Sequence, residues 1–411
     1  MKILVINCGS SSVKCKLFQV GKGNYRVLAA GVIEKIAEGS SVVHLRWPGG
    51  SIECEKTVSS HRQALEMLEQ LLLDHKILAD FSALDVIAHR VVHGGEKFHQ
   101  PVVVNNEVIE TIKVLIPLAP LHNPFNLEGI MVLREKAPRV EQVAIFDTAF
   151  HQTMPEVSYL YALPYDLYRK KNVRRYGFHG ISHSYLVKAA SRFLAQNPGE
   201  LNAISLHLGN GASAAAVKNG RSVDTSMGMT PMEGLVMGTR SGDVDPGILV
   251  YLERECGLDG DHIDDMLNTQ SGLKGLCAEN DMREIVQRLE KGDEKARIAF
   301  EVFCYRLKKY IGAYAAVLGR VDVLIFSGGI GAYSPEVREK VCEGLDHLGI
   351  SLDVVKNKAV QRDIDRLDDG TQKVKVLRIV TDEELEMAQQ AAKTAVSQAR
   401  TFGKVSQKVE I

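Results

Sequence analysis

The chain has 411 residues, of which 45% are hydrophobic and 25% charged, so its length predicts two globular domains with a core each. A formal net charge of −1 excludes the strongly basic surface that binds nucleic acid. The sequence has no apolar run long enough to span a bilayer and no signal-peptide pattern, and its seven scattered cysteines form neither a disulfide ladder nor a metal cluster. We therefore expect a cytoplasmic protein without a membrane or nucleic-acid partner.

The first expected element is a buried strand at 2–7, followed by a polar turn at 8–12 and a second strand at 13–20. The polar residues around this turn are Asn7, Ser10, Ser12 and Lys14. Glycine and small hydroxyl residues let backbone N–H groups and side-chain oxygens face a phosphate or the waters of a metal. The pattern fits a phosphate-binding hairpin and also an ordinary hairpin.

Arg90 follows the next buried strand, which is expected at 83–88 after further strands at 31–51 and a helix that begins at Ser60. In open α/β sheets, ligands bind beyond the carboxyl ends of the strands. Arg90 is therefore a candidate ligand-binding residue, and a buried ion pair is the alternative.

Asp147 ends another strand, expected at 143–146. This position is typical of a metal ligand or a general base, and equally of a helix N-cap. Before it lie a proline-rich segment at 117–124, which carries His122, and a helix at 126–136. A lone histidine is more often structural than catalytic, so His122 is a weak candidate by itself.

A second strand–turn–strand pattern occupies 202–218, with a glycine-rich turn at 209–213. It resembles the N-terminal hairpin and predicts a duplicated chain whose second copy starts about half-way along. A basic segment and a helix at 184–194 precede it. That segment contains Arg174, Arg175, His179 and His183.

Residues 224–246 are too polar and glycine-rich for a core element. Arg240 in this segment offers a planar set of donors suited to a carboxylate or a phosphate. Long loops of this kind in compact chains are usually functional. The alternative is an ordered surface loop in which Arg240 pairs with a nearby aspartate.

The remainder is expected to be helical at 247–310, with a strand at 321–326, a glycine-rich turn at 327–331 and a helix capped by Ser334. A glycine-rich turn before a helix N-terminus favours phosphate. The chain contains neither the P-loop motif nor G-x-G-x-x-G. After a strand at 374–380, a final helix should end at about 399, before a loose polar tail.

Together these segments predict a phosphoryl-transfer site, which requires arginine, a metal and backbone N–H groups around the transferring group. They also resemble the acetokinase family of acetate kinases over nearly the whole chain. The matching segments are NCGSSSVK at 7–14, HRVVHGGE at 89–96, APLHNP at 119–124, FDTAFH at 146–151, RRYGFHGISH at 174–183, HLGNGAS at 207–213, the whole of 224–246, DMR at 281–283, SGGIG at 327–331 and TDEEL at 381–385.

The resemblance implies an α/β protein with the duplicated actin-like, ribonuclease-H-like fold and an active site in the cleft between two domains. The first domain would comprise 1–147 and, through a returning C-terminal helix, about 384–411. The second would comprise 148–383 and carry the nucleotide-binding loops. The implied activity is that of a phosphotransferase with a carboxyl acceptor: reversible transfer of the ATP γ-phosphoryl to acetate, giving acetyl phosphate and ADP. Mg²⁺, or Mn²⁺ in its place, would be required, and the assembly is usually a homodimer.

The resemblance also assigns roles to single residues. Arg90 and Arg240 would bind the acetate carboxylate and the transferring phosphoryl, and His179 would hydrogen-bond that phosphoryl, with His122 nearby. Asn7, Asp147 and Glu383 would organise the metal, with Glu384 as the alternative to Glu383. The methyl pocket would consist of Val92, Leu121, Phe178 and Pro231. The nucleotide would contact Lys14, His207, Leu208, Gly209, Asn210, Gly211, Asp281, Met282, Arg283, Gly329, Ile330, Gly331, Ala332 and Tyr333.

Two points refine this expectation. A carboxylate acceptor is already ionised near pH 7, so Asp147 should serve the metal and orientation rather than remove a proton. The family usually has Glu-Asn where this chain has Ala332-Tyr333, which leaves the choice among ATP, GTP and pyrophosphate open. A propionate or butyrate kinase is the close alternative, and a non-catalytic actin-like ATP-binding clamp is the alternative of another class.

Overall fold

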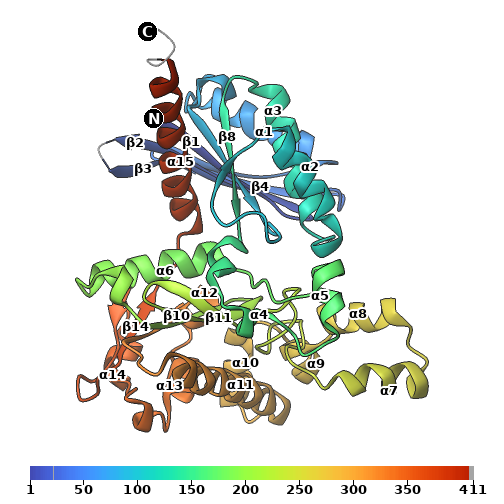
Figure 1. Ribbon diagram of the computed structural model, residues 1–411, viewed down its shortest axis with the longest axis vertical. Helices are drawn as coiled ribbons and strands as arrows, with labels where there is room; N and C mark the ends of the chain where they lie inside the picture. The colour runs from blue at the N-terminus through green and yellow to red at the C-terminus, as the bar shows by residue number, and fades with distance from the viewer. Residues whose placement is uncertain (22, 407–411) are drawn as a thin grey trace. The chain divides into compact units, whose positions relative to one another are not determined.

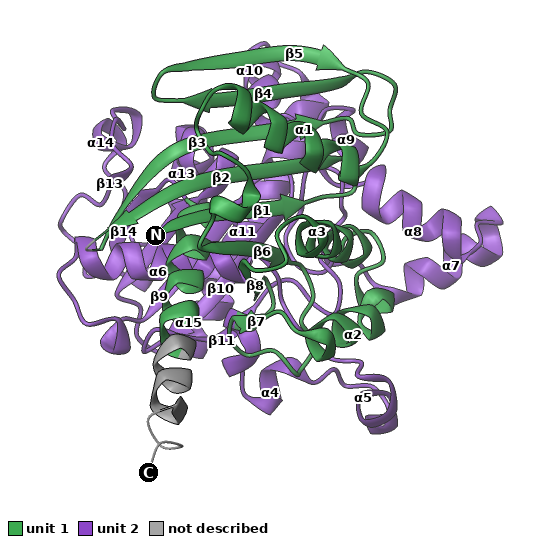
Figure 2. Cartoon of the chain, turned by 90° about the horizontal axis from the view of Figure 1, so that it is seen from above, with its two compact units in different colours: residues 1–149, 382–411 green, residues 150–381 purple. Residues whose placement is uncertain are grey.

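The computed structural model describes residues 1–21 and 23–406, the last nine of them, 398–406, by their backbone alone. No helix among these residues is long and apolar enough to cross a membrane. The chain divides into two compact units, coloured separately in Figure 2. Unit 1 comprises residues 1–149 and 382–411, and unit 2 comprises residues 150–381. The sequence predicts the boundaries at 147 and 384.

Unit 1 is built on an eight-stranded sheet with the order β5-β4-β3-β2-β1-β6-β8-β7. Its strands are β1 Lys2–Cys8, β2 Ser12–Gly21, β3 Asn24–Glu34, β4 Ser41–Trp47, β5 Gly50–Lys56, β6 Val86–Val91, β7 Val102–Val103 and β8 Glu141–Phe146. β1 pairs antiparallel with β2, and β1, β6 and β8 are parallel neighbours. The parallel strands are buried apolar runs, as their central place in the sheet requires.

The helices of unit 1 cover this sheet. They are α1 His61–Asp74, α2 Asn106–Val114, α3 Asn123–Lys136 and α15 Glu383–Ser406. The Ser60 hydroxyl caps α1, as predicted, by accepting a hydrogen bond from the Gln63 backbone N–H at 3.2 Å. α15 contacts β1, β6 and β8, so the C-terminal helix packs on the N-terminal sheet (Figure 1). This helix continues past the predicted end at 399, and the predicted loose tail from 407 lies outside the described residues.

Unit 2 is built on a six-stranded sheet with the order β11-β10-β9-β12-β14-β13. Its strands are β9 Ala203–Leu208, β10 Ala212–Lys218, β11 Arg221–Thr225, β12 Val323–Ser327, β13 Ile364–Arg366 and β14 Lys375–Ile379. β9 and β10 form an antiparallel hairpin, while β9, β12 and β14 run parallel. The order β3-β2-β1-β6-β8 in unit 1 is thus repeated as β11-β10-β9-β12-β14, which confirms the predicted duplicated α/β fold.

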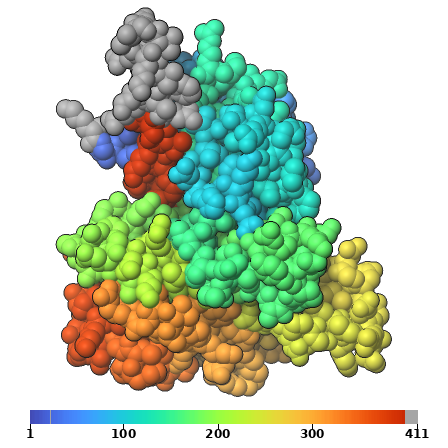
Figure 3. Space-filling model, viewed as in Figure 1, coloured from blue at the N-terminus to red at the C-terminus, as the bar shows by residue number. Residues whose placement is uncertain are grey.

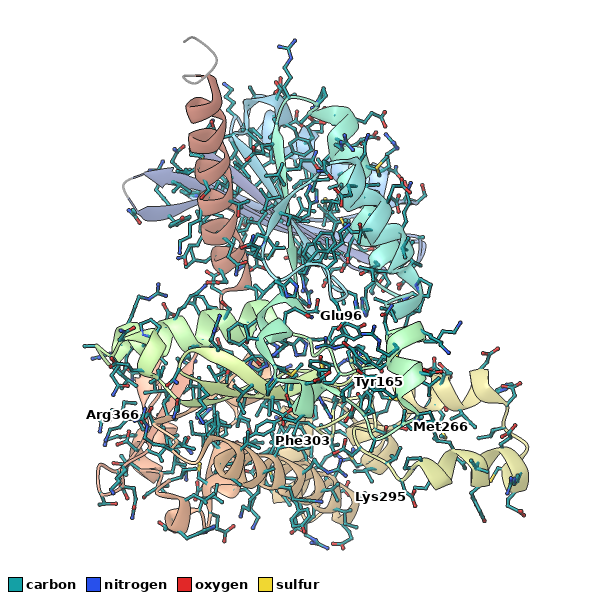
Figure 4. All side chains as sticks on the ribbon, in the orientation of Figure 1. Glu96, Tyr165, Met266, Lys295, Phe303 and Arg366 are labelled. Atoms are coloured by element: carbon teal, nitrogen blue, oxygen red, sulfur yellow. The ribbon has the colours of Figure 1, made fainter. Side chains whose placement is uncertain are left out.

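The helices of unit 2 are more numerous. They are α4 Glu156–Tyr159, α5 Tyr165–Lys171, α6 Gly180–Phe193, α7 Pro246–Cys256, α8 Gly260–Thr269, α9 Gly272–Cys277, α10 Met282–Glu290, α11 Glu294–Leu318, α12 Gly328–Tyr333, α13 Pro335–Cys342 and α14 Val354–Lys358. α6 packs on β9, β12 and β14. The long α11 buries Phe303 inside the unit and exposes Lys295 near its N-terminal end (Figure 4).

One local prediction is wrong. The glycine-rich segment at 327–331 is not an open turn, because Gly328–Tyr333 forms the short helix α12. The buried Arg338 donates from Nη1 to the carbonyls of Gly331 and Ala332, both at 2.9 Å. These bonds satisfy carbonyl groups that the end of a short helix would otherwise leave unpaired.

Candidate active site

Arg90 and Asp147 form an ion pair at the carboxyl ends of β6 and β8 in unit 1. Arg90 Nε donates to Asp147 Oδ1 at 3.0 Å, and Nη2 donates to Oδ2 at 2.5 Å. Burial alone would lower the pKa of Arg90, but the adjacent Asp147 carboxylate raises it above its usual value. Asp147 is 2% exposed, so this bidentate pair is the buried ion pair that the sequence left as an alternative.

Glu383, at the start of α15, is the carboxylate that faces this pair. Burial raises the pKa of Glu383; the Asp147 charge adds to the rise, while Arg90 and Lys14 oppose it. Burial likewise raises the pKa of Glu384, but the cation near it is Lys16. Both glutamates interact electrostatically with Arg90, but only Glu383 is also affected by the Asp147 charge.

The carboxylate and amide oxygens of Asp147, Glu383 and Asn7 in unit 1 are of the kind that binds Mg²⁺. The described residues contain no group of three or more His, Cys, Asp or Glu side chains arranged to hold a metal. Mg²⁺ is commonly bound through one or two carboxylates together with substrate phosphates, so it does not need such a group. Asp147 and Glu383 supply the carboxylates, and a divalent cation would relieve their mutual repulsion. The Asn7 amide lies at the end of β1, opposite Lys14 in the hairpin.

His179, in unit 2, is the N-cap residue of α6 and has a left-handed backbone with φ 55°. This conformation costs a non-glycine residue on the order of 1 kcal/mol, so the surrounding structure must hold it in place. Its ring Nδ1 lies 3.0 Å from the Ser213 hydroxyl, and the His207 ring is centred 4.4 Å away. Both contacts fix the orientation of the imidazole.

Arg240 is half-buried and has no carboxylate partner among the described residues. Its Nη1 donates to the Pro231 carbonyl at 3.0 Å, and burial lowers its pKa. The nearby acidic residues serve other groups: Asp243 pairs with Arg306, and Asp245 caps α7. The alternative of a loop fixed by an Arg240–aspartate pair is therefore wrong.

The Arg240 and His179 side chains converge on the backbone of Gly211, at the turn between β9 and β10. A Cβ atom placed on Gly211 would lie 3.4 Å from Arg240 Nη1 and 3.6 Å from His179 Nε2. The absence of a side chain leaves this space open to a ligand atom. A cation and an imidazole that reach the same small space are well suited to an anionic oxygen.

A pocket of about 540 Å³ lies in unit 2, next to this turn. Its lining comprises Gly209, Asn210, Asn280, Asp281, Met282, Arg283, Gly329, Ile330, Tyr333 and Ser334. The structure thus brings together most of the predicted nucleotide-binding residues of this unit. His207, Leu208, Gly211, Gly331 and the buried Ala332 lie outside the lining. The sequence reasoning missed Asn280 and Ser334, although both adjoin motifs it used.

The ring of Tyr333, one of the two residues at which the resemblance predicts a departure, contacts Arg378. Tyr333 is 62% exposed, and the Arg378 guanidinium carbon lies 5.1 Å from the ring centroid. Arg378 is itself buried and donates from Nε to the Ala332 carbonyl at 3.1 Å. The ring is thus an exposed aromatic surface at the edge of the pocket.

The remaining predicted residues are divided between the units. Val92, Leu121, His122 and Lys14 belong to unit 1, where Val92 is buried and Leu121 is 62% exposed. Phe178, which is buried, and Pro231 belong to unit 2. The methyl pocket that would combine residues of both units stays a prediction.

A further pocket of about 600 Å³ lies in unit 1, between residues 97–108 and α15, which are neighbours in Figure 3. Phe98, Val102 and Val108 line one side, and Lys393, Thr394 and Ser397 the other. The predicted site residues do not line it. We assign no role to this pocket.

Comparisons with known proteins agree with the predicted family. Residues 2–389 match the model of the acetokinase family. The acetate kinase of Sulfurovum sp. (strain NBC37-1) is 52% identical over 95% of this chain and 98% of its own length. The crystal structure of Porphyromonas gingivalis acetate kinase gives a TM-score of 0.90 at 45% identity, covering 96% of this chain and 99% of that one. The crystal structure of a propionate kinase from Francisella tularensis gives 0.89 at 41% identity, covering 95% and 99%.

Proposed function

The chain belongs to the acetokinase family, and on this premise we propose that it transfers the γ-phosphoryl of ATP to acetate, giving acetyl phosphate and ADP, and that it catalyses the reverse reaction. The observation that carries the proposal is the convergence of Arg240 and His179 above Gly211. Arg240 has no carboxylate partner among the described residues, so its charge is available to a phosphoryl group.

Arg240 and His179 would stabilise the charge on the transferring phosphoryl, and Arg90 would hold the acetate carboxylate. Phosphoryl transfer needs in-line positioning and charge stabilisation more than covalent chemistry by the protein. Acetate is ionised near pH 7, so the site needs no general base. Asp147 would then orient Arg90, as its bidentate contact with that guanidinium supports.

Asn7, Asp147 and Glu383 would hold Mg²⁺, directly or through water. When bound, the ion neutralises charge on the phosphate oxygens. The proximity of Glu383 to Asp147 supports this assignment over one with Glu384. His122 would lie near the transferring phosphoryl.

The pocket of unit 2 would bind ADP and ATP. The exposed ring of Tyr333 offers a stacking surface for a base, since aromatic side chains stack on purines. Lys14, from unit 1, would contact the phosphates. A homodimer in the cytoplasm completes the proposal, and light scattering of the purified protein measures its assembly state.

Propionate is the second candidate acceptor, because one of the similar solved structures is a propionate kinase. One additional methylene group lets a pocket discriminate between acetate and propionate by only about 1–3 kcal/mol. Val92, Leu121, Phe178 and Pro231 would set this preference. The non-catalytic clamp loses its support, because the whole chain matches a family of kinases.

The test is acyl phosphate formation trapped as hydroxamate. Acetate, propionate and butyrate would each be combined with ATP, GTP and pyrophosphate, with Arg240→Ala as the comparison. We expect turnover with acetate and ATP, and its loss in the variant. Turnover with another donor would make Ala332 and Tyr333 determinants of donor choice. Absence of turnover with every acid would contradict the proposal.

A further inference from the structure

His179 is the first residue of a hydrogen-bonded relay that leads away from the Gly211 space. The relay consists of His179, Ser213, His183 and Ser205. The Ser213 hydroxyl lies 3.0 Å from His179 Nδ1 and 2.8 Å from His183 Nε2. The other ring nitrogen of His183, Nδ1, lies 2.9 Å from the Ser205 hydroxyl. All four residues belong to unit 2.

The four residues of this relay are held in position by the helix α6 and the strands β9 and β10. His179 and His183 lie one helical turn apart, at the N-cap and in the first turn of α6, so their side chains share a face. Ser205 and Ser213 lie on the paired strands β9 and β10. His183, Ser205 and Ser213 are fully buried, so bulk water does not replace one of these side chains as a hydrogen-bond partner.

Ser205, at the buried end of the relay, determines the direction in which the hydrogen bonds are donated. Within the described part of the protein, His183 Nδ1 is the only hydrogen-bond partner of the Ser205 hydroxyl. Ser205 must therefore donate to Nδ1, because the opposite arrangement would bury a hydroxyl proton without an acceptor. His183, which then has its proton on Nε2, donates to Ser213. Ser213 in turn donates to His179 Nδ1, and the proton of His179 is left on Nε2.

The surroundings keep the relay neutral. Burial holds the pKa of His183 well below its usual value, and the adjacent His151 and His207 lower it further. Two of the groups that face His179 are His207, whose ring packs against it, and Arg240 across the Gly211 space. A guanidinium at this position opposes a second positive charge.

We propose that Ser205, His183 and Ser213 are positioning residues that hold His179 as the neutral tautomer with its proton on Nε2. Nε2 is the nitrogen that faces the Gly211 space together with Arg240 Nη1. The contacts that assign this tautomer all lie within unit 2. Its use, as a hydrogen-bond donor to a phosphoryl oxygen that is already in place before the reaction, rests on the proposed function.

The first test observes the tautomer directly. Protein with ¹⁵N-labelled histidine is studied by NMR at pH 8, and the His179 signals are identified by their loss in His179→Gln. We expect the chemical shifts of a proton on Nε2 in the unaltered chain. His183→Leu, which removes the donor to Ser213, should give a mixture of both tautomers. His183→Gln should keep the original one, because its amide can donate to Ser213 and accept from Ser205.

The second test uses the pH dependence of the rate. At pH 8 we expect His183→Leu to lose roughly tenfold in kcat, less than the roughly 100- to 1,000-fold lost when such a donor is deleted outright. An imidazolium carries a proton on both nitrogens, so the deficit should shrink only at a pH low enough to charge His179. The kcat of His183→Gln should be close to that of the unaltered enzyme at each pH.

Two controls keep the outcome decisive. Ser213→Ala removes only a hydroxyl and should reproduce the mixed tautomers if His183→Leu does not fold. Ser191→Ala removes another buried hydroxyl of α6, bonded to the Gln196 carbonyl, and should change neither the tautomer nor the pH profile. A proton on Nδ1 in the unaltered chain, or a folded His183→Gln that loses as much kcat as His183→Leu, overturns the proposal. The NMR result stands even if acetate is not the substrate, so the two proposals can fail separately.

Discussion

Arg90 and Arg240 have the same side chain in opposite electrostatic surroundings. Arg90 forms two hydrogen bonds to the buried carboxylate of Asp147. Arg240 donates to a backbone carbonyl and has no carboxylate partner within the described residues. Removal of Arg90 would thus leave a buried carboxylate without its partner, whereas Arg240 retains an uncompensated charge for a ligand.

This difference predicts that truncation of Arg90 destabilises the protein far more than truncation of Arg240. Arg90→Ala leaves Asp147 buried and unpaired, so we expect the free energy of unfolding to fall by about 3 kcal/mol. Arg240→Ala should change it by less than about 1 kcal/mol, because no buried partner is left behind. Urea unfolding monitored by circular dichroism measures both. The double variant Arg90→Ala, Asp147→Ala should recover part of the first loss; equal losses for the two arginines would contradict the interpretation.

Gly211 offers a second prediction for a single residue. In Gly211→Ala the new methyl group would occupy the space that Arg240 and His179 face, at ordinary contact distances from both. The protein should therefore fold with an unchanged melting temperature and lose at least about tenfold in kcat/KM. Gly312→Ala, on α11, is the matched control, because nothing lies within 4 Å of its new methyl group. A fully active Gly211→Ala would exclude this space as the phosphoryl site.

Sequence motifs named candidate residues for the site but not the contacts that those residues make. Arg90, Asp147 and Arg240 were identified from their positions beside strands and glycines. A buried ion pair remained the alternative for Arg90 without Asp147 as its named partner, because the pair joins residues from separate parallel strands. Ser205 was not identified, since a serine inside an apolar strand has no pattern that marks a hydrogen bond to a helix.

At the level of elements, α12 shows how tertiary contacts override local preference. Its glycine-rich sequence favours a turn, and glycine is unfavourable in a helix interior. The carbonyls of Gly331 and Ala332 nevertheless receive hydrogen bonds from the buried Arg338. Burial and the nearby Arg378 lower the pKa of Arg338 to about 10, which still leaves it charged near neutral pH. Such distant donors cannot be read from the local sequence.

The last residue of α12 gives a prediction about nucleotide binding. Tyr333→Ala should weaken ADP binding by about tenfold, since base–aromatic stacking contributes about 1–3 kcal/mol. Tyr333→Phe retains the ring above Arg378 and should bind ADP as the unaltered chain does. Isothermal titration calorimetry measures both dissociation constants. If Tyr333→Ala binds ADP normally, the base does not use this ring.

At the level of the whole molecule, the duplication is the part of the fold that the sequence predicted well, and the structure shows it as a repeated strand order. β1–β2 and β9–β10 were recognisable because each hairpin is a strand, a glycine-containing turn and a strand. The short edge strands β7 and β13 were missed, because so few residues carry no usable periodicity. α4 and α5 were also missed, and they have no buried residues that would mark one apolar face.

The division into two units leads to a prediction for hydrogen exchange. The pocket proposed for the nucleotide is lined by residues of unit 2 alone. ADP without acetate should therefore slow exchange most strongly in the segments 209–211, 280–283 and 329–334. At a hundred times its dissociation constant, a ligand stabilises the form that binds it by about 2.7 kcal/mol, so the slowing should be large.

Mass spectrometry of peptides from both units measures this protection. The β1–β2 turn of unit 1 serves as an internal comparison, because protection there would support a contact from Lys14. Peptides of α1, whose core positions Leu65 and Leu68 pack inside unit 1, should exchange as they do without ADP. Tyr333→Ala, compared at the same ADP concentration, should reduce the protection in all three segments of unit 2, because fewer molecules are then occupied. Protection confined to unit 1 would contradict the assignment of the pocket, whereas protection of the three segments together would show that one nucleotide links the β9–β10 turn, α10 and α12.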